Sequence, residues 1–172
     1  MDLKNFVRDI PDFPIPGILF RDITTVLKDP IALAGAVDAM VELLGGNLEF
    51  DIIMGPESRG FIFGMPMAYK LGKGFVPVRK AGKLPGEVAR KEYALEYGSA
   101  IIEIHKDAII PGQKYIIADD LLATGGTAKA TADLITEMGG EVVSMLFFIE
   151  LAGLKGRDVL EGYNVRSVLT YE

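Results

Sequence analysis

Residues 115–127 read Tyr-Ile-Ile-Ala-Asp-Asp-Leu-Leu-Ala-Thr-Gly-Gly-Thr. The apolar run at their start predicts a buried strand, which ends in two acids, Asp119 and Asp120. A turn rich in glycine and threonine follows, and it enters a predicted helix over 127–138. Because ligands of parallel α/β sheets bind outside the carboxyl ends of the strands, we expect this turn to lie where small molecules bind.

Beyond this stretch, short apolar runs alternate with helical segments along most of the chain. Strands are predicted at 50–54, 74–78, 115–118, 142–149 and, as an edge strand, 165–171. Helices are predicted from Leu3 to Ile10, from Asp29 to Leu44, over 61–71 and over 127–138. This alternation is typical of an α/β fold whose mostly parallel sheet is covered on both faces. The length of 172 residues suits a single domain, residues 1–172.

The composition excludes several classes of protein. With no cysteine and one histidine, the chain cannot carry disulfides, thiolate catalysis, Cys-ligated zinc or a multi-histidine metal site. Its 18 Lys and Arg against 24 Asp and Glu give a net charge of −6, so we expect no nucleic-acid partner. No apolar run approaches the roughly 18 residues of a membrane span. The N-terminus lacks an apolar signal segment, so we expect no membrane partner and a cytoplasmic location.

One polar segment, residues 79–98, interrupts the alternation. Five of the 18 basic residues lie in it: Arg79, Lys80, Lys83, Arg90 and Lys91. Loops of this length inside compact domains are usually functional or disordered. One interpretation is a solvated surface excursion. The other is a basic lid over an anionic ligand, which the contrast with the acidic remainder of the chain favours.

The turn after Asp120 has the chemistry of a phosphate site. Glycines let backbone N–H groups approach a phosphate closely, threonine hydroxyls add donors, and a helix N-terminus favours negative charge. Carboxylates repel a phosphate, so the two acids indicate a ligand that also presents hydroxyls, as a ribose does, or carries Mg²⁺. The alternative is a strand that ends in solvated acids, followed by a threonine cap. The concentration of all these residues in positions 119–127 favours a site for a phosphorylated sugar.

The run from Asp119 to Thr127 resembles the phosphoribosyl-pyrophosphate motif of the type I phosphoribosyltransferases, and the resemblance extends over nearly the whole chain. Further matching segments are Phe13 to Ile23, Leu27 to Pro30, Gly55 to Gly64, Val78 to Gly86 and Leu95 to Gly98. The run 119–127 indicates the superfamily. The Phe-Arg-Asp-Ile segment at 20–23 and the Leu-Glu-Tyr-Gly segment at 95–98 point to its adenine branch.

This resemblance implies a fold, a reaction and partners. The implied fold is a parallel five-stranded sheet flanked by helices, with a small N-terminal hood over residues 1–30 and a long, mobile lid loop over 79–98. The implied enzyme is a glycosyltransferase of purine salvage that moves the 5-phosphoribosyl group from phosphoribosyl pyrophosphate to adenine, giving AMP and pyrophosphate. Mg²⁺ is the implied cofactor, carried by the substrate with no direct protein ligand. The implied assembly is a homodimer.

The resemblance also implies which residues bind phosphoribosyl pyrophosphate. Those implied to hold the 5′-phosphate are Ala123, Thr124, Gly125, Gly126 and Thr127. Asp119 and Asp120 would bind the ribose hydroxyls. The implied pyrophosphate loop consists of Glu57, Ser58, Arg59 and Gly60, in which related enzymes hold a non-proline cis peptide. A guanidinium pairs bidentately with phosphate oxygens, which suits Arg59, although a surface ion pair is the equal interpretation from the residue alone. Glu57 stands where many relatives carry Asp.

The remaining assignments fall in the lid and at the base. Residues that match the basic start of the mobile loop are Arg79, Lys80 and Lys83, one of which in related dimers reaches the neighbouring subunit's pyrophosphate. Residues implied at the adenine are Phe20, stacking on the ring, Arg21 beside it in the hood, and Leu151 on the other side. Core packing is the alternative for Phe20 and Leu151.

Glu96 corresponds to the family's catalytic glutamate. Attack by purine N9 needs its proton removed, and a lid carboxylate can share that proton. The alternative is an exposed strand glutamate.

Three other functions stay open on the sequence alone. The same fold could act on another base, such as xanthine, hypoxanthine or orotate, although no charged side chain is placed to read an exocyclic oxygen. A phosphoribosyl-pyrophosphate-sensing regulator could keep the pocket without catalysis, but such proteins usually bind nucleic acid, which the net charge of −6 disfavours. A phospho-acceptor receiver domain also places acids after a strand, but near its N-terminus, whereas Asp119 is deep in this chain.

Overall fold

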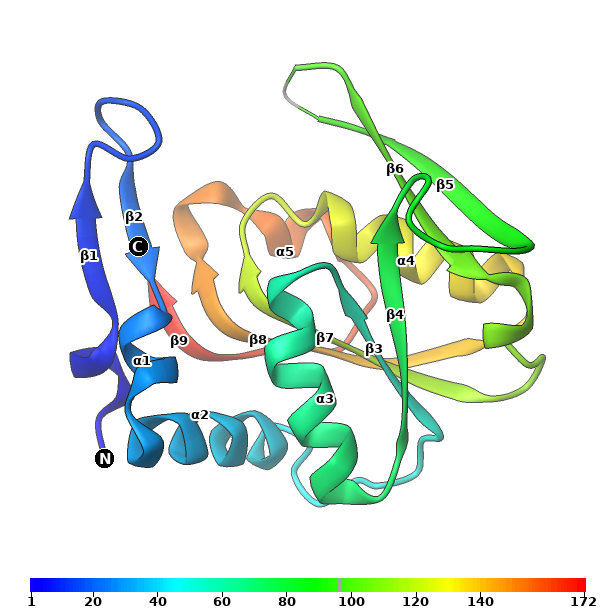
Figure 1. Ribbon diagram of the computed structural model, residues 1–172, viewed down its shortest axis with the longest axis horizontal. Coiled ribbons are helices and arrows are strands. Elements are labelled where there is room, and N and C mark those ends of the chain that lie inside the picture. The colour runs from blue at the N-terminus through cyan, green and yellow to red at the C-terminus, as the bar shows by residue number, and fades with distance from the viewer. Residues whose placement is uncertain (96) are drawn as a thin grey trace.

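The structure is a computed structural model that describes residues 1–95 and 97–172. Among these residues, seven strands form one sheet in the order β5-β6-β4-β3-β7-β8-β9 (Figure 1). Five of them run parallel: β4 (Gly74–Lys80), β3 (Ile52–Pro56), β7 (Lys114–Leu122), β8 (Glu141–Leu151) and β9 (Val165–Tyr171). The predicted α/β fold with a mostly parallel sheet is confirmed, and each predicted strand is present within a few residues of its expected bounds.

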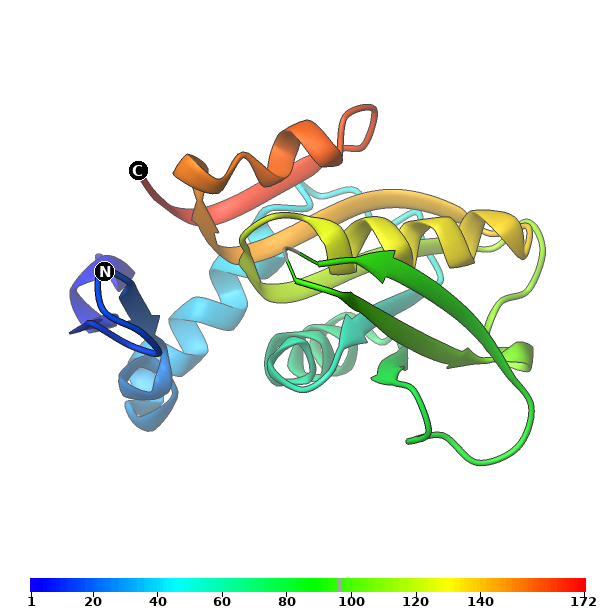
Figure 2. The ribbon, with the colours of Figure 1, turned by 90° about the horizontal axis from the view of Figure 1, so that it is seen from above.

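Side chains of β7 alternate between two cores, because successive residues of a strand point to opposite faces of the sheet. Ile116 and Ala118 belong to one buried cluster, while Tyr115 and Ile117 belong to the other. The first cluster lies under α2 (Pro30–Glu42) and α3 (Arg59–Leu71), and the second under α4 (Gly126–Glu137) and the short α5 (Gly156–Val159). Helices therefore cover both faces, as Figure 2 shows.

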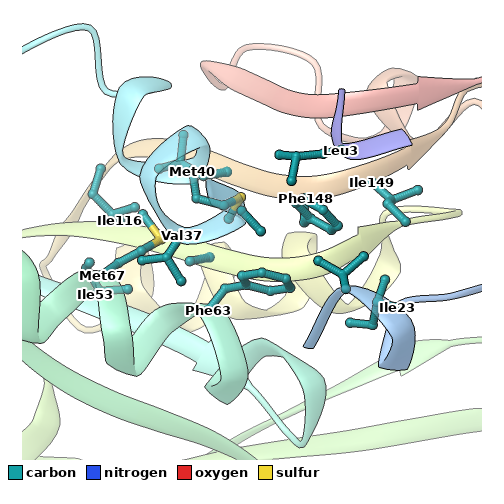
Figure 3. Close-up of a cluster of buried hydrophobic side chains, with 14 of the residues drawn as sticks. Leu3, Ile23, Val37, Met40, Ile53, Phe63, Met67, Ile116, Phe148 and Ile149 are labelled. Atoms are coloured by element: carbon teal, nitrogen blue, oxygen red, sulfur yellow. The ribbon is translucent and has the colours of Figure 1, made fainter. Parts of the chain in front are cut away.

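The first cluster is centred on two stacked aromatic rings. Phe63 of α3 and Phe148 of β8 have ring centroids 4.9 Å apart at an interplanar angle of 27°, and both are fully buried. Figure 3 shows them with Met67 and Ile53 on one side and Ile23 and other apolar residues on the other. This packing holds the amino end of α3, where the predicted pyrophosphate loop lies, against the centre of the sheet.

The N-terminal region differs from the predicted helix. Only Leu3–Phe6 form a helical turn, of the 3-10 type, and Ile10 lies in β1 (Arg8–Pro11), which pairs antiparallel with β2 (Leu19–Asp22). Prolines follow Ile10 closely, and proline disfavours the helical region for the residue before it. The buried carboxylate of Asp22 accepts hydrogen bonds from Arg8 and from Thr24 N, the first residue of the short helix α1 (Thr24–Lys28). The first contact joins the two strands of the hairpin, which lies within the predicted hood, and the second joins β2 to α1.

The basic segment 79–98 is the second difference. The sequence predicts a loop, but residues Val88–Ala94 form β5, which pairs antiparallel with β6 (Ser99–His105) along its whole length. Burial alternates from Arg90 to Ala94, so this strand leaves one face in water. The two strands form a hairpin at the edge of the sheet (Figure 2). Mobility of the segment stays a prediction.

Within the described part of the chain, no helix has the length and apolar character that crossing a membrane requires.

Truncating the stacked pair tests the importance of this core. We expect Phe148→Ala to lower the free energy of unfolding by about 3–5 kcal/mol, because it removes buried area and leaves a cavity beside Phe63. Ile31→Ala, at a position that is 71% exposed, is the control and should change stability by no more than about 0.5 kcal/mol. Urea denaturation followed by circular dichroism measures both. Equal effects would contradict this account of the core.

Candidate active site

A pocket of about 240 Å³ opens at the carboxyl ends of β3 and β7. This is the edge at which parallel α/β sheets bind their ligands. Nine residues singled out from the sequence line it: Glu57, Arg59, Asp119, Asp120, Ala123, Thr124, Gly125, Gly126 and Thr127. Two separate segments thus meet in one cavity: the stretch that joins β3 to α3, and the end of β7 with the turn that follows it.

The turn before α4 leaves the amino end of that helix without a side-chain cap. The N-cap residue is Gly125, with φ of +83°, and no side chain accepts a hydrogen bond from the first turn. A helix N-terminus in this state offers backbone N–H donors and a positive dipole end to an anion. The hydroxyl-bearing residues Thr124 and Thr127 flank the two glycines, so the predicted phosphate chemistry is present in one place.

A close backbone contact supports this turn from behind. A Cβ on Gly125 would lie 2.7 Å from the carbonyl oxygen of Gly156, and a Cβ on Gly156 would lie 2.4 Å from that of Ala123. Only glycine fits at either position without movement of the backbone. The second of these glycines begins α5, which Arg157 ties to the sheet through two hydrogen bonds to the buried carboxylate of Glu150. No local pattern of the sequence marks Gly156, because the residues it contacts in the turn lie 31 or more positions away in the chain.

Asp119 and Asp120 form a buried acidic pair at the end of β7. Asp119 keeps some contact with solvent through the pocket, but protein atoms surround its carboxylate elsewhere, and its Oδ1 accepts the backbone N–H of Asp120 at 2.8 Å. Burial raises the pKa of the Asp119 carboxyl well above its ordinary value, and the adjacent charge of Asp120 raises it further. Burial also raises the pKa of Asp120, against the opposing effect of Arg59.

Arg59 is the first residue of α3, and its guanidinium Nε lies 2.9 Å from Asp120 Oδ2. About half of its side chain is exposed, so the cation faces the pocket while it pairs with the acid. Gly60 brings this helix close to β7, since a Cβ there would lie 2.9 Å from Asp119 Oδ1. Arg59 therefore places one positive charge beside the two carboxylates. Its exposed part can also bind an anionic group of a ligand in the pocket.

The peptide bond between Glu57 and Ser58 is cis, as the resemblance to related enzymes implies for this loop. Glu57 accepts hydrogen bonds from Arg79 Nε at 2.9 Å and from Lys80 N at 2.6 Å. Burial acts to raise the pKa of the Glu57 carboxyl, but these two donors outweigh it and lower the pKa. The loop is therefore held to the end of β4, and Arg79 reaches the pocket wall through Glu57 and not directly.

Other predicted residues lie outside this pocket. Lys80, the last residue of β4, and Lys83 beyond it are exposed, and Ser58 within the loop 57–60 is also exposed. Leu151, at the end of β8, packs against the first core cluster. Glu96 lies outside the described residues.

The two hood residues point in different directions. Phe20 is half-buried and meets Phe13 edge to face, with ring centroids 5.2 Å apart. The guanidinium of Arg21 instead pairs with Asp9 and lies 4.0 Å from the ring centroid of Tyr171. Neighbouring residues of a strand face opposite sides, so the Arg21 side chain cannot share a ligand surface with Phe20. The assignment of Arg21 to the adenine site stays a prediction.

Further residues line the pocket without having been predicted. Tyr93, Ala94 and Leu95 reach it from the edge hairpin, and Phe147 reaches it from β8. The sequence Val88–Ala94 offers no clear alternation as a signal, because Arg90, Lys91 and Glu92 are consecutive charged residues, and its period-two burial is visible only in the structure. No local feature of the sequence says which neighbour the inward face of this strand would meet.

Known proteins match the whole of this architecture. The model of a family described as "Phosphoribosyl transferase domain" matches residues 22–168. An adenine phosphoribosyltransferase from Lachnoclostridium phytofermentans is 59% identical, with 98% of this chain and 97% of that protein covered. This chain belongs to the adenine phosphoribosyltransferase family. The predicted type I phosphoribosyltransferase fold is confirmed with it, and a receiver domain is excluded.

Solved members of the adenine phosphoribosyltransferase family superpose closely. The crystal structure from Thermoanaerobacter pseudethanolicus matches with a TM-score of 0.95 at 52% identity, covering 99% of this chain and 98% of that one. The Saccharomyces cerevisiae member matches with a TM-score of 0.92 at 43% identity, covering 98% and 97%. It was solved in complex with an iminoaltritol bisphosphate and adenine.

The contact behind the phosphate turn gives one prediction. Gly156→Ala would place a methyl group within 2.4 Å of the Ala123 carbonyl oxygen and 2.8 Å of Leu122 Cδ1, so the turn must move. We expect at least tenfold weaker binding of ribose 5-phosphate by calorimetry, with a loss of about 1–3 kcal/mol in stability. Gly153→Ala is the control, since its nearest atom would be 3.7 Å away. An unchanged affinity of Gly156→Ala for ribose 5-phosphate would show that Gly156 does not support the phosphate turn.

The acidic pair gives a second prediction. Because the folded-state pKa of Asp119 is raised above its ordinary value of 3.8, ionisation of this residue opposes folding, and stability falls as pH rises through the folded-state pKa. We expect Asp119→Asn to stabilise the ligand-free protein at pH 7 by about 1 kcal/mol, or about 2–4 °C in Tm. The gain should shrink as pH falls towards 3.8. Thermal unfolding at pH 7 and pH 4.5 tests this, and a variant less stable at pH 7 would contradict it.

Proposed function

We propose that this protein transfers the 5-phosphoribosyl group from phosphoribosyl pyrophosphate to adenine, giving AMP and pyrophosphate, as an enzyme of purine salvage. The observation that carries the proposal is the meeting of an uncapped helix N-terminus, two carboxylates and an arginine in one pocket. These groups match, in turn, the phosphate, the ribose hydroxyls and the pyrophosphate of that substrate. The relatives named above support the choice of adenine as acceptor.

In this proposal the substrate lies along the carboxyl edge of the sheet. The 5′-phosphate accepts hydrogen bonds from the turn 123–127, and the ribose hydroxyls donate to Asp119 and Asp120. Pyrophosphate lies over the loop 57–60, where Arg59 turns from Asp120 towards the phosphate oxygens. Ribose hydroxyls then take over the contacts of the acid pair that Arg59 gives up. Binding the substrate thus exchanges one set of charge-assisted hydrogen bonds for another.

The reaction forms a bond between purine N9 and the anomeric carbon while the bond from that carbon to pyrophosphate oxygen breaks. The electron pair leaves with pyrophosphate, and positive charge builds up on the ribose ring. Asp119 and Asp120 lie where they can stabilise that charge through the ribose hydroxyls. The N9 proton passes to the carboxylate of Glu96, a role that rests on its place in the Leu-Glu-Tyr-Gly segment of the family.

Mg²⁺ belongs to this proposal as part of the substrate. Among the described residues, no group of three or more His, Cys, Asp or Glu side chains is arranged as a metal site. Glu57 already pairs with Arg79, and the ribose hydroxyls bind Asp120 in this proposal. A metal ion that arrives on the pyrophosphate oxygens fits these surroundings, and it would neutralise charge on the leaving group.

The base would lie between the hood and the end of β8. Phe20 stacks on one face of adenine and Leu151 contacts the other, while the backbone of Arg21 reads its edge. The pairing of the Arg21 guanidinium with Asp9 and Tyr171 leaves Phe20 on the opposite face of β2, free to meet the base. Bound adenine would contact both the hood and the end of β8, above the pocket.

The proposal also includes the assembly of the protein, its location and its lid. The protein works as a homodimer in the cytoplasm, and residues Arg79, Lys80 and Lys83 form the basic start of a lid that reaches pyrophosphate. The lid keeps water from the activated sugar, which it would otherwise hydrolyse. Sedimentation equilibrium of the purified protein tests the dimer.

The decisive experiment offers five bases separately, with Mg²⁺ and phosphoribosyl pyrophosphate: adenine, hypoxanthine, guanine, xanthine and orotate. We expect nucleotide from adenine alone. Product from another base would overturn the base assignment while keeping the chemistry. No product at all, with phosphoribosyl pyrophosphate still bound, would favour a sensing regulator.

Glu96→Gln tests the proton acceptor. We expect kcat to fall by at least a hundredfold because the amide cannot take the N9 proton, while the affinity for AMP stays nearly unchanged. Glu92→Gln is the matched control, since Glu92 lies four residues earlier in the chain and its side chain is exposed beside Ser99. Steady-state kinetics and AMP titration measure both variants. Equal kcat values in the two variants would assign Glu96 to the protein surface.

A further inference from the structure

The edge hairpin lies along α4, and one face of β5 is turned towards that helix. Ala89 and Tyr93 pack against the second core cluster, of which α4 is a part, and Lys91 between them pairs with Glu137 at the last turn of α4. The intervening residues Arg90 and Glu92 are exposed. Because alternate residues of β5 face α4, the hairpin is attached to that helix at two points. Lys91 contacts the carboxyl end of α4, and Tyr93 contacts its amino end.

Tyr93 makes its contacts at the turn that would hold the 5′-phosphate. Its hydroxyl lies 2.9 Å from Thr127 Oγ1, a hydrogen-bond distance at which either oxygen can donate. Its ring covers Gly126 so closely that a Cβ there would lie 3.3 Å from Tyr93 Cδ2. Both Tyr93 and Thr127 line the pocket. A residue of the hairpin is thus in direct contact with the phosphate turn.

The direction of this hydrogen bond decides what Thr127 can offer a ligand. A threonine hydroxyl has one proton to donate and can accept through its lone pairs. If Tyr93 donates, the Thr127 proton is free to point into the pocket and bind a phosphate oxygen. If Thr127 donates instead, its proton is already used, and a phosphate must compete with Tyr93 for it.

The geometry points to Tyr93 as a positioning residue for the 5′-phosphate: its hydroxyl donates to Thr127 Oγ1 and orients the threonine proton towards the ligand. A phosphate dianion favours this direction, because two linked hydrogen bonds that run towards an anion polarise one another in the same sense. The inference rests on the proposed function. It adds that the hairpin of β5 and β6 is attached to the phosphate turn through one side chain.

Tyr93→Phe removes the hydroxyl and keeps the ring over Gly126. We expect the Kd for ribose 5-phosphate, measured by calorimetry on the full-length protein, to rise five- to tenfold, and the KM for phosphoribosyl pyrophosphate to rise in parallel. The KM for adenine should stay within twofold, because adenine carries no phosphate. Lys91→Met is the matched control: it removes the other attachment of β5 to α4, the ion pair with Glu137 at the opposite end of that helix, and should leave both constants unchanged.

A double-mutant cycle separates orientation of Thr127 from a general loosening of the hairpin. In a Thr127→Val background, Tyr93→Phe should weaken ribose 5-phosphate binding by less than twofold, because the group it orients is gone. Additive losses would overturn the inference, as would unchanged binding in Tyr93→Phe. Tighter binding would show that Thr127 donates to Tyr93. Wild-type protein that binds ribose 5-phosphate but forms no nucleotide would contradict the proposed function and leave this test intact.

Discussion

Strand β7 is buried on both faces, and this constraint organises the rest of the molecule. Its side chains must alternate between two cores, so helices are required on either side of the sheet. The strand is also central, with β3 on one side and β8 on the other, and both neighbours run parallel to it. The carboxyl ends of three buried strands therefore meet at one edge. The acids and the phosphate turn follow directly from that edge, so the core and the site share one strand.

The buried charges of the site lower the stability of the folded protein. Two adjacent carboxylates are buried at the end of β7, and one guanidinium, from Arg59, lies beside them. Burying a charge is unfavourable unless it is paired and hydrogen-bonded, and here the pairing is incomplete. At the same edge, the first turn of α4 presents donors that no side chain caps. A ligand with a phosphate and vicinal hydroxyls satisfies both sets of groups, so a locally unfavourable arrangement becomes a specific binding site.

Close approaches between backbones hold the site in shape. Gly125 meets Gly156, and Gly60 meets Asp119 and Pro56, at distances that any larger residue would disturb. The Glu150–Arg157 ion pair fixes the short α5 behind the phosphate turn, while Tyr93 contacts the same turn from the front. The turn is thus enclosed from two sides by segments that lie 25 or more residues away in the chain.

The sequence by itself determined the parallel strands, the main helices, and the acids and phosphate turn of the pocket, while only the resemblance to the family indicated Glu57 and Arg59. It could do so because apolar periodicity and the order of strand, acids, glycine turn and helix are local patterns, each contained in about a dozen positions. Two expectations were wrong. A helix was expected over Ile10, where nearby prolines favour a strand. A loop was expected over residues 79–98, where β5 gains its order only by pairing with β6.

Only the tertiary structure decided which of these segments touch. The contact of Tyr93 with Thr127, the support from Gly156 and the direction of the Arg21 side chain join residues that are far apart in the chain. Such contacts depend on how helices and strands pack, and no local pattern encodes that packing.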